Sequence, residues 1–228
     1  IRDRFTGGLT NDGGNVNVTS GVSLLSGDIT NLGTVIVSGN GQATFWGLAG
    51  GSTLLNDGEF RVSDGSEATL FVDVIGAGSY TGLGTKRFEA GFSPGSSPGL
   101  VSAEGDSMFG AGASIEMEIA GLELGEDYDH YRVDGKLDLG GTLNVKLLDG
   151  FTPQQGDEFD LFDALEFAGA FASLNFGDAA LASGLRWNFS QLNSTGTLSV
   201  SAVPLPAGVW LMLSGLVGFG VFRRRQAA

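Results

Sequence analysis

A short strand-like segment bounded by glycines occurs three times in the first third of the chain. Each copy begins at a glycine, alternates polar residues with Val or Phe, and ends at a second glycine, over Gly14–Gly21, Gly33–Gly39 and Gly58–Gly65. The first glycines of successive copies are 19 and 25 residues apart. This spacing is typical of one coil of a parallel β-solenoid, with the difference absorbed in the turns.

Burial of the apolar residues favours stacked coils. The strands of one coil are too short to form a core alone, so their Val, Leu and Phe side chains need the next coil on top of them. Glycine and asparagine supply the left-handed corners between strands. Gln42–Phe45 and Glu67–Leu70, which follow the second and third copies, are also similar to each other. An antiparallel β-sandwich is the alternative, because it also has short strands separated by glycine turns.

The rest of the chain is less regular. Two Pro-Gly turns within Phe92–Leu100 mark a change in pattern, and one helical or irregular piece is expected at Asp163–Phe171. We therefore divide the chain into solenoid coils at 1–91, an irregular continuation and cap at 92–201, and a tail at 202–228. Strands are expected at Ser114–Ile119, Tyr131–Val133, Lys136–Leu139, Thr142–Leu148, Phe159–Phe162 and Gly196–Ser201.

Composition excludes several kinds of chemistry. With no cysteine and one histidine, the chain cannot form a disulfide scaffold, a zinc–thiolate site, an iron–sulfur cluster or a site with several histidines. We expect no metal and no cofactor. The formal net charge of −14 repels phosphate backbones, so nucleic acid is not an expected partner.

The C-terminal tail has the pattern of a membrane span. Ala207–Phe222 carries no charge, and as a helix it would be about 24 Å long; extension back to Val203 gives about the length that crosses a bilayer. Arg223, Arg224 and Arg225 follow directly, which places that end in the cytoplasm and the acidic body on the other side. Because the chain starts at Ile1 without a secretion signal, we expect this sequence to be a fragment or a processed form.

The same tail resembles the PEP-CTERM protein-sorting signal. The resemblance consists of Val203-Pro204-Leu205-Pro206-Ala207, a glycine-dotted apolar stretch to Phe222 and the arginine cluster, in that order. VPLPA replaces the Pro-Glu-Pro triplet of the commonest form. The resemblance implies export in a Gram-negative bacterium, a precursor anchored in the inner membrane, and processing by an exosortase-type membrane protease/transpeptidase. It also implies a link to exopolysaccharide and biofilm.

The second half of the body resembles the C-terminal part of autotransporter passenger domains and related bacterial surface β-helices. The matching pieces run in order through Ser93–Leu100, Tyr128–Val133, Leu139–Val145, Gly150–Pro153, Gly156–Phe159 and Leu185–Asn188. This resemblance implies a right-handed parallel β-helix closed by an irregular cap.

Two groups of titratable residues are candidate catalytic sites. Asp127, Asp129 and His130 contain the single imidazole, but no G-x-S-x-G motif supplies a nucleophile, so we interpret them as a surface loop. Glu116 and Glu118 point to one side of a strand, and we interpret them as a solvated face with Ile115, Met117 and Ile119 turned inward. No catalytic residue is assigned. The function predicted is that of a non-enzymatic structural or adhesive protein of the cell surface or extracellular matrix; a polysaccharide lyase or hydrolase on a β-helix is the alternative.

Overall fold

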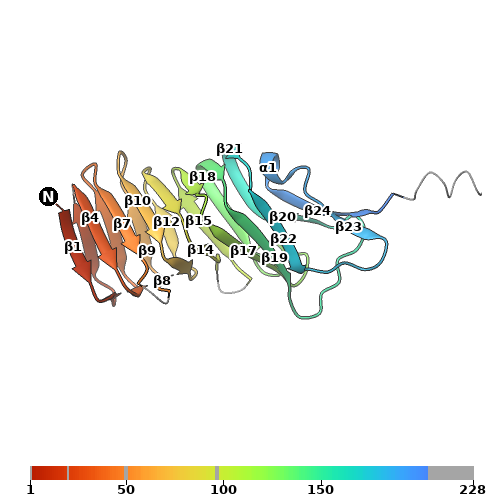
Figure 1. Cartoon of the computed structure of the whole chain (residues 1–228), viewed down its shortest axis with the longest axis horizontal. Coiled ribbons are helices and arrows are strands. Elements are labelled where there is room, and N and C mark those ends of the chain that lie inside the picture. The colour runs from red at the N-terminus through yellow and green to blue at the C-terminus, as the bar shows by residue number, and fades with distance from the viewer. Residues whose placement is uncertain (1, 20, 49–50, 96–97, 205–228) are drawn as a thin grey trace, which may run out of the picture.

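The strands of the chain lie in three sheets along one long axis. The computed structural model describes residues 2–19, 21–48, 51–95 and 98–204. A 13-stranded and an 8-stranded sheet, both parallel, form an elongated stack that starts at β1, and a 3-stranded antiparallel sheet lies at the other end (Figure 1). The structure is thus all-β with extensive parallel pairing, as expected of a β-helix. The antiparallel sandwich is excluded as the arrangement of the two large sheets.

Each of the first five coils contributes three strands, one to each of three stacks. The first stack contains β1 (Arg2–Thr6), β4 (Val22–Ser26), β7 (Gln42–Trp46), β10 (Glu67–Phe71), β13 (Thr85–Phe88) and β16 (Ser107–Phe109). The second contains β2 (Leu9–Asn11), β5 (Ile29–Asn31), β8 (Thr53–Asn56), β11 (Asp73–Ile75), β14 (Gly91–Phe92), β17 (Ser114–Ile119), β19 (Thr142–Leu147) and β22 (Ser173–Asp178). The third contains β3 (Asn15–Thr19), β6 (Thr34–Ser38), β9 (Glu59–Val62), β12 (Ser79–Thr81) and β15 (Leu100–Glu104).

The register confirms the predicted repeat. Asn15 pairs with Thr34, which pairs with Glu59, so the residues that follow the three glycines lie directly above one another. Gln42 pairs with Glu67, which places the two similar segments after the second and third copies in adjacent strands of the first stack. The expected strand Ser114–Ile119 is β17 with the same bounds.

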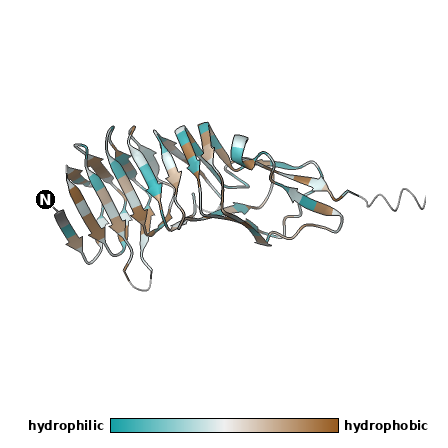
Figure 2. Cartoon of the chain, turned by 45° about the horizontal axis from the view of Figure 1, so that its top comes forward, coloured by the Kyte–Doolittle hydropathy of each residue, from teal (hydrophilic) through white to brown (hydrophobic). Residues whose placement is uncertain are grey.

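Inward side chains form continuous columns along the stack. One column in the second stack consists of apolar residues through eight successive strands: Leu9, Ile29, Leu54, Val74, Phe92, Ile115, Leu143 and Leu174. Figure 2 shows hydrophobic and hydrophilic residues alternating along many of these strands. Since full burial of one such side chain contributes about 1.5–3 kcal/mol, the stacking of coils supplies the core that a single coil lacks.

The glycines that start the second and third copies are required by close packing. A Cβ atom built on Gly58 would lie closer than 3.0 Å to the carbonyl oxygen of Gly33, and one built on Gly33 would meet the carbonyl oxygen of Gly14 in the same way. Gly78 has the same relationship to Gly58. These glycines lie at the corner between the second and third stacks. Successive coils can pack closely at this corner because glycine has no side chain.

A ladder of asparagines, which the sequence analysis missed, lies beside this glycine corner. Asn11 donates through Nδ2 to Oδ1 of Asn31 at 2.8 Å, and Asn31 donates in turn to Oδ1 of Asn56 at 2.7 Å. All three side chains are buried. The signal was present in the sequence, because each of these asparagines stands two or three residues before a corner glycine.

Beyond the fifth coil, two long strands continue the first and third stacks. β18 (His130–Leu139) pairs with β15 through its first half and with β16 through its second half, and β21 (Phe162–Gly169) pairs along β18. The expectation of a helical or irregular piece at Asp163–Phe171 is therefore wrong, since most of it is the strand β21. Ladder hydrogen bonds to β18 and burial of Phe162 outweigh the helix preference of its Ala and Leu residues.

A small antiparallel sheet follows the last coils. It consists of β20 (Glu158–Asp160), β24 (Thr197–Ala202) and β23 (Leu185–Asn188), with β24 in the middle. The short helix α1 (Leu192–Thr195) precedes β24 and ends at Gly196, whose φ of 75° forms a left-handed cap. Phe159 of β20 and Trp187 of β23 pack edge to face with ring centroids 6.0 Å apart.

Candidate functional site

The predicted sorting motif begins directly after β24, the last described strand. Val203 directly follows β24, and its backbone N–H donates to the carbonyl oxygen of Gly184 at 2.8 Å. Val203 and Pro204 are exposed, with Val203 at 48%. The remaining motif residues Leu205, Pro206 and Ala207, the apolar stretch and Arg223, Arg224 and Arg225 lie outside the described residues.

The predicted membrane span also falls almost wholly outside that part of the chain. Within residues 2–204, apart from the gaps given above, no helix combines the length and apolar character needed to cross a bilayer.

The interpretation of Asp127, Asp129 and His130 as a surface loop is wrong for two of the three residues. Asp129 and His130 are buried, because the loop after β17 folds back against the stack, and only Asp127 is partly exposed. Asp129 accepts backbone N–H hydrogen bonds from Gly99 and Glu118, both at 2.8 Å, and thereby joins this loop to the adjacent coil. Burial is the main cause that raises the pKa of Asp129 to about 7.

His130 also connects parts of the fold. Its Nδ1 lies 2.6 Å from the carbonyl oxygen of Asp160 in the C-terminal sheet. Because a carbonyl only accepts, Nδ1 carries the proton and donates. The side chain of Asp160 accepts a hydrogen bond from the Thr197 hydroxyl at 2.7 Å. This arrangement holds the C-terminal sheet against β18.

A cleft of about 540 Å³ opens beside His130, between the solenoid and the C-terminal sheet. Its charged lining includes Arg132, Asp160 and Asp163. Arg132 Nε is 3.1 Å from Asp134 and 3.9 Å from Asp163, and these groups are more than half exposed. The cleft has the polarity to bind a small polar molecule. Its aspartates and histidine form hydrogen bonds and ion pairs mainly with neighbouring strands. We therefore interpret the cleft as a structural junction between the solenoid and the C-terminal sheet.

Glu116 and Glu118 confirm the expected alternation. Both are partly exposed, whereas Ile115, Met117 and Ile119 between and beside them are fully buried. Glu116 pairs with Lys146 on β19 at 2.6 Å, so it links two neighbouring coils on the outside of the second stack. No group of three or more His, Asp or Glu side chains able to hold a metal ion occurs among the residues that the structure describes.

Lys86 is a buried cation that the sequence analysis missed. It lies on β13 at an inward position, and its Nζ donates to the carbonyl oxygens of Gly82, at 2.5 Å, and Glu104. Burial lowers the pKa of Lys86 to about 8, while Glu104 and Asp106 act in the opposite direction. The amine satisfies two carbonyl groups at the corner between the third and first stacks, which is a structural role.

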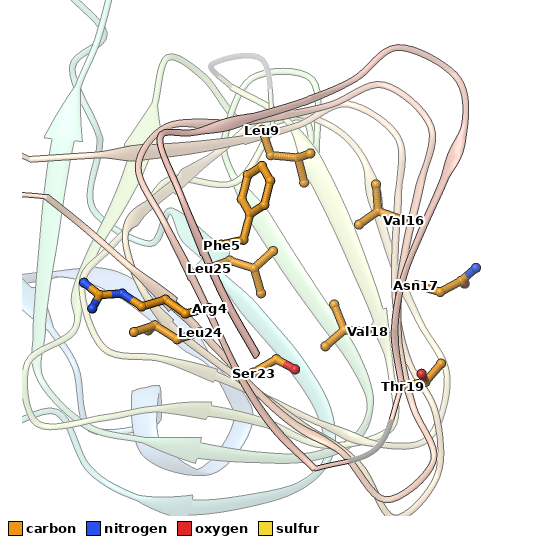
Figure 3. Close-up of a pocket in the computed structure, with 10 residues that line it drawn as sticks. All are labelled: Arg4, Phe5, Leu9, Val16, Asn17, Val18, Thr19, Ser23, Leu24 and Leu25. Atoms are coloured by element: carbon orange, nitrogen blue, oxygen red, sulfur yellow. The ribbon is translucent and has the colours of Figure 1, made fainter. Parts of the chain in front are cut away.

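The first two described coils line a hollow at the β1 end of the stack. Phe5, Leu9, Val16, Val18 and Leu25 point into the space that these coils enclose, while Asn17 and Thr19 point away from it (Figure 3). The resulting hollow measures about 440 Å³. β1, β2 and β3 are the outermost strands of their stacks among the residues that the structure describes.

An outward-facing aromatic pair, of which Trp46 is exposed and Phe71 partly exposed, lies on the outer face of the first stack; it is the third feature that the sequence analysis missed. Trp46 at the end of β7 is 49% exposed and pairs in register with Phe71 at the end of β10. Their ring centroids are 4.6 Å apart and their planes are tilted by 45°. The period-2 pattern of β7 and β10 could have identified both residues as outward-facing.

Comparisons with protein-family models, with curated proteins and with solved structures find no match to this chain.

Proposed function

We propose that this chain is the body and sorting tail of an exported structural or adhesive protein of the cell surface or extracellular matrix. In this proposal the body is a right-handed parallel β-helix held at the outer side of the inner membrane by the tail at 202–228. An exosortase-type protease/transpeptidase then processes the chain near Val203–Ala207, and the body reaches the surface or the matrix, where exopolysaccharide is its partner.

The position of the motif carries the proposal. A processing enzyme needs an accessible segment, and the last described strand ends at Ala202, immediately before Val203 and Pro204, both exposed. Cleavage after Pro204 would leave β24 and its pairing with β20 and β23 intact. The body would therefore stay folded after its release.

The architecture of the body supports a structural role. Stacked coils bury one continuous core and present long outward faces, which suit contacts with extended partners. The net charge of −14 keeps copies of the protein apart in a hydrated setting.

Expression of the full chain behind a secretion signal in a Gram-negative host tests the sorting role. We expect the wild-type chain in the membrane fraction without an exosortase-type enzyme, and in the medium or at the cell surface when that enzyme is present. A chain without residues 203–228 should leave the membrane in both hosts. Identical fractionation of the two chains would refute the sorting role.

The alternative is a polysaccharide-acting enzyme, for which the cleft beside His130 offers the only described set of cationic, acidic and imidazole groups in one hollow. Incubation of the protein with acidic polysaccharides and calcium separates the two functions. New reducing ends or unsaturated products would favour the enzyme, whereas the structural proposal predicts unchanged polysaccharide.

A further inference from the structure

The outward aromatic pair has the form of a stacking surface, which we call the Trp46–Phe71 platform. The two side chains occupy the last outward positions of adjacent strands, which lie about 4.8 Å apart in a parallel sheet. Both rings lie outside the core, since the inward neighbours Phe45 and Leu70 fill that space. The platform is therefore held by the register of β7 and β10 without contributing to the solenoid interior.

Polar groups surround the platform. Thr44 and Thr69 are paired in register and occupy the preceding outward positions of the same two strands, and the Thr69 hydroxyl donates to Glu67 at 3.3 Å. A hollow of about 320 Å³ adjoins the platform and includes Asp73 and Glu89 in its lining. This volume lies at the lower end of the range for small-molecule sites, which suits one or two sugar rings.

Both carboxylates are held by hydrogen bonds, Asp73 by a backbone N–H and Glu89 by a side chain. Oδ1 of Asp73 accepts the N–H of Gly91 at 2.9 Å, and Glu89 accepts from Arg87 Nε at 2.6 Å. A carboxylate has room for about four hydrogen bonds, so the exposed Asp73 retains acceptor capacity for a hydroxyl donor, and Glu89, whose side chain is 11% exposed, retains a smaller share of it. Fixed acceptors beside outward-facing aromatic rings suit a ligand that has an apolar face and a rim of hydroxyls.

We propose that the Trp46–Phe71 platform and the hollow beside it bind a glycan chain without acidic groups. Sugar rings stack their C–H faces on the two aromatic rings, and their hydroxyls donate to Asp73 and Glu89. The inference rests on the proposed function, because it names the class of polysaccharide that the exported body meets.

The negative charge around the platform favours a neutral glycan over an acidic one. The strands and turns around the platform carry Glu67, Asp73 and Glu89 against one nearby cation, Arg87, which is already paired with Glu89. The whole chain has a net charge of −14. Uronate or phosphate groups would be repelled on approach, whereas neutral hydroxyls would not.

Isothermal titration calorimetry on the full chain, kept in a detergent without a sugar headgroup, tests the proposal. The probes are neutral glucan, mannan and galactan oligosaccharides and an oligogalacturonate of the same length. We expect saturable binding of at least one neutral probe, weakened about tenfold in Trp46→Ala and in Phe71→Ala. Because the ligand carries no charge, raising the salt concentration should leave its affinity unchanged.

Phe189→Ala is the matched control, because Phe189 is an equally exposed aromatic at the other end of the molecule. It should bind like the wild type, and thermal unfolding verifies that each variant is folded. Equal affinities of Trp46→Ala and Phe189→Ala would overturn the proposal, as would tighter binding of oligogalacturonate or no binding of any neutral probe. Export and tail processing are measured without glycan. Failure of the glycan-binding proposal is therefore distinguished from failure of the proposed sorting role.

Discussion

Asn31 donates through its Nδ2 atom to Oδ1 of Asn56, 2.7 Å away and one coil further along the stack. It also donates to the carbonyl oxygen of Glu59 at 3.0 Å and accepts from Asn11. A fully buried amide thus satisfies its hydrogen bonds by repeating the same contact from coil to coil. This ladder makes the position of each coil depend on the coil below it.

The ladder predicts a large effect of removing its middle member. Asn31→Ala leaves buried polar groups of Asn11 and Asn56 without their partner. We therefore expect the free energy of unfolding to be about 2–4 kcal/mol lower than that of the wild type. Urea denaturation followed by circular dichroism measures the change. Asn17→Ala, on the exposed face of β3, is the control and should shift stability by less than about 0.5 kcal/mol.

The glycine corner predicts that the same change, glycine to alanine, lowers stability by different amounts at Gly58 and at Gly14. Gly58→Ala would bring a methyl group into the backbone of Gly33, whereas the nearest atom to a methyl group at Gly14 is Oδ1 of Asn11 at 3.3 Å. We expect Gly58→Ala to destabilise the chain by about 2 kcal/mol or more, and Gly14→Ala by clearly less. Similar unfolding midpoints for the two variants would contradict the stacking of these corners.

Asp129 predicts a pH dependence of stability. Its folded pKa of about 7 lies above the ordinary value of 3.8, so between about pH 4 and pH 7 the folded chain binds more protons than the unfolded chain. Its contribution to stability therefore falls as pH rises through this window. The difference in urea midpoint between wild type and Asp129→Asn should change with pH there, and carboxyl NMR should place the titration near pH 7. A titration near pH 4 would contradict the assignment.

Lys86 predicts the opposite pH dependence of stability, in the alkaline range. Its folded pKa of about 8 lies below the ordinary 10.5, so between about pH 8 and pH 10.5 the unfolded chain binds more protons. Stability contributed by this residue therefore rises with pH over that window. In Lys86→Met the rise should be absent when urea midpoints are compared at pH 8 and pH 10. An equal rise in both proteins would show that another group causes it.

The coil repeat could be predicted from sequence because its determinants are local. Gly33 and Gly58 stand where a corner stacked on the preceding coil needs a residue without a side chain, and the spacings of 19 and 25 residues from Gly14 to Gly33 and from Gly33 to Gly58 are those of the observed register. The asparagine ladder was equally visible but was assigned to turns, because the same residue type favours both.

The buried junction could not be predicted in this way. Asp129 and His130 have neighbours such as Glu126 and Asp127 that are typical of a solvated loop, and their burial depends on contacts with Gly99 and Asp160, about 30 residues away. The segment of β21 is predicted from sequence as helical or irregular for a related reason. Its Ala- and Leu-containing sequence has little local preference against a helix, and its pairing with β18 decides the outcome.

Mass spectrometry of the mature C-terminus tests the central claim most directly. The full chain is exported in a Gram-negative host that contains an exosortase-type enzyme, and its C-terminal peptide is sequenced. The account predicts a new end within or next to Val203–Ala207, with the body through Ala202 retained. An exported chain that still ends in Arg225-Gln226-Ala227-Ala228 would contradict it.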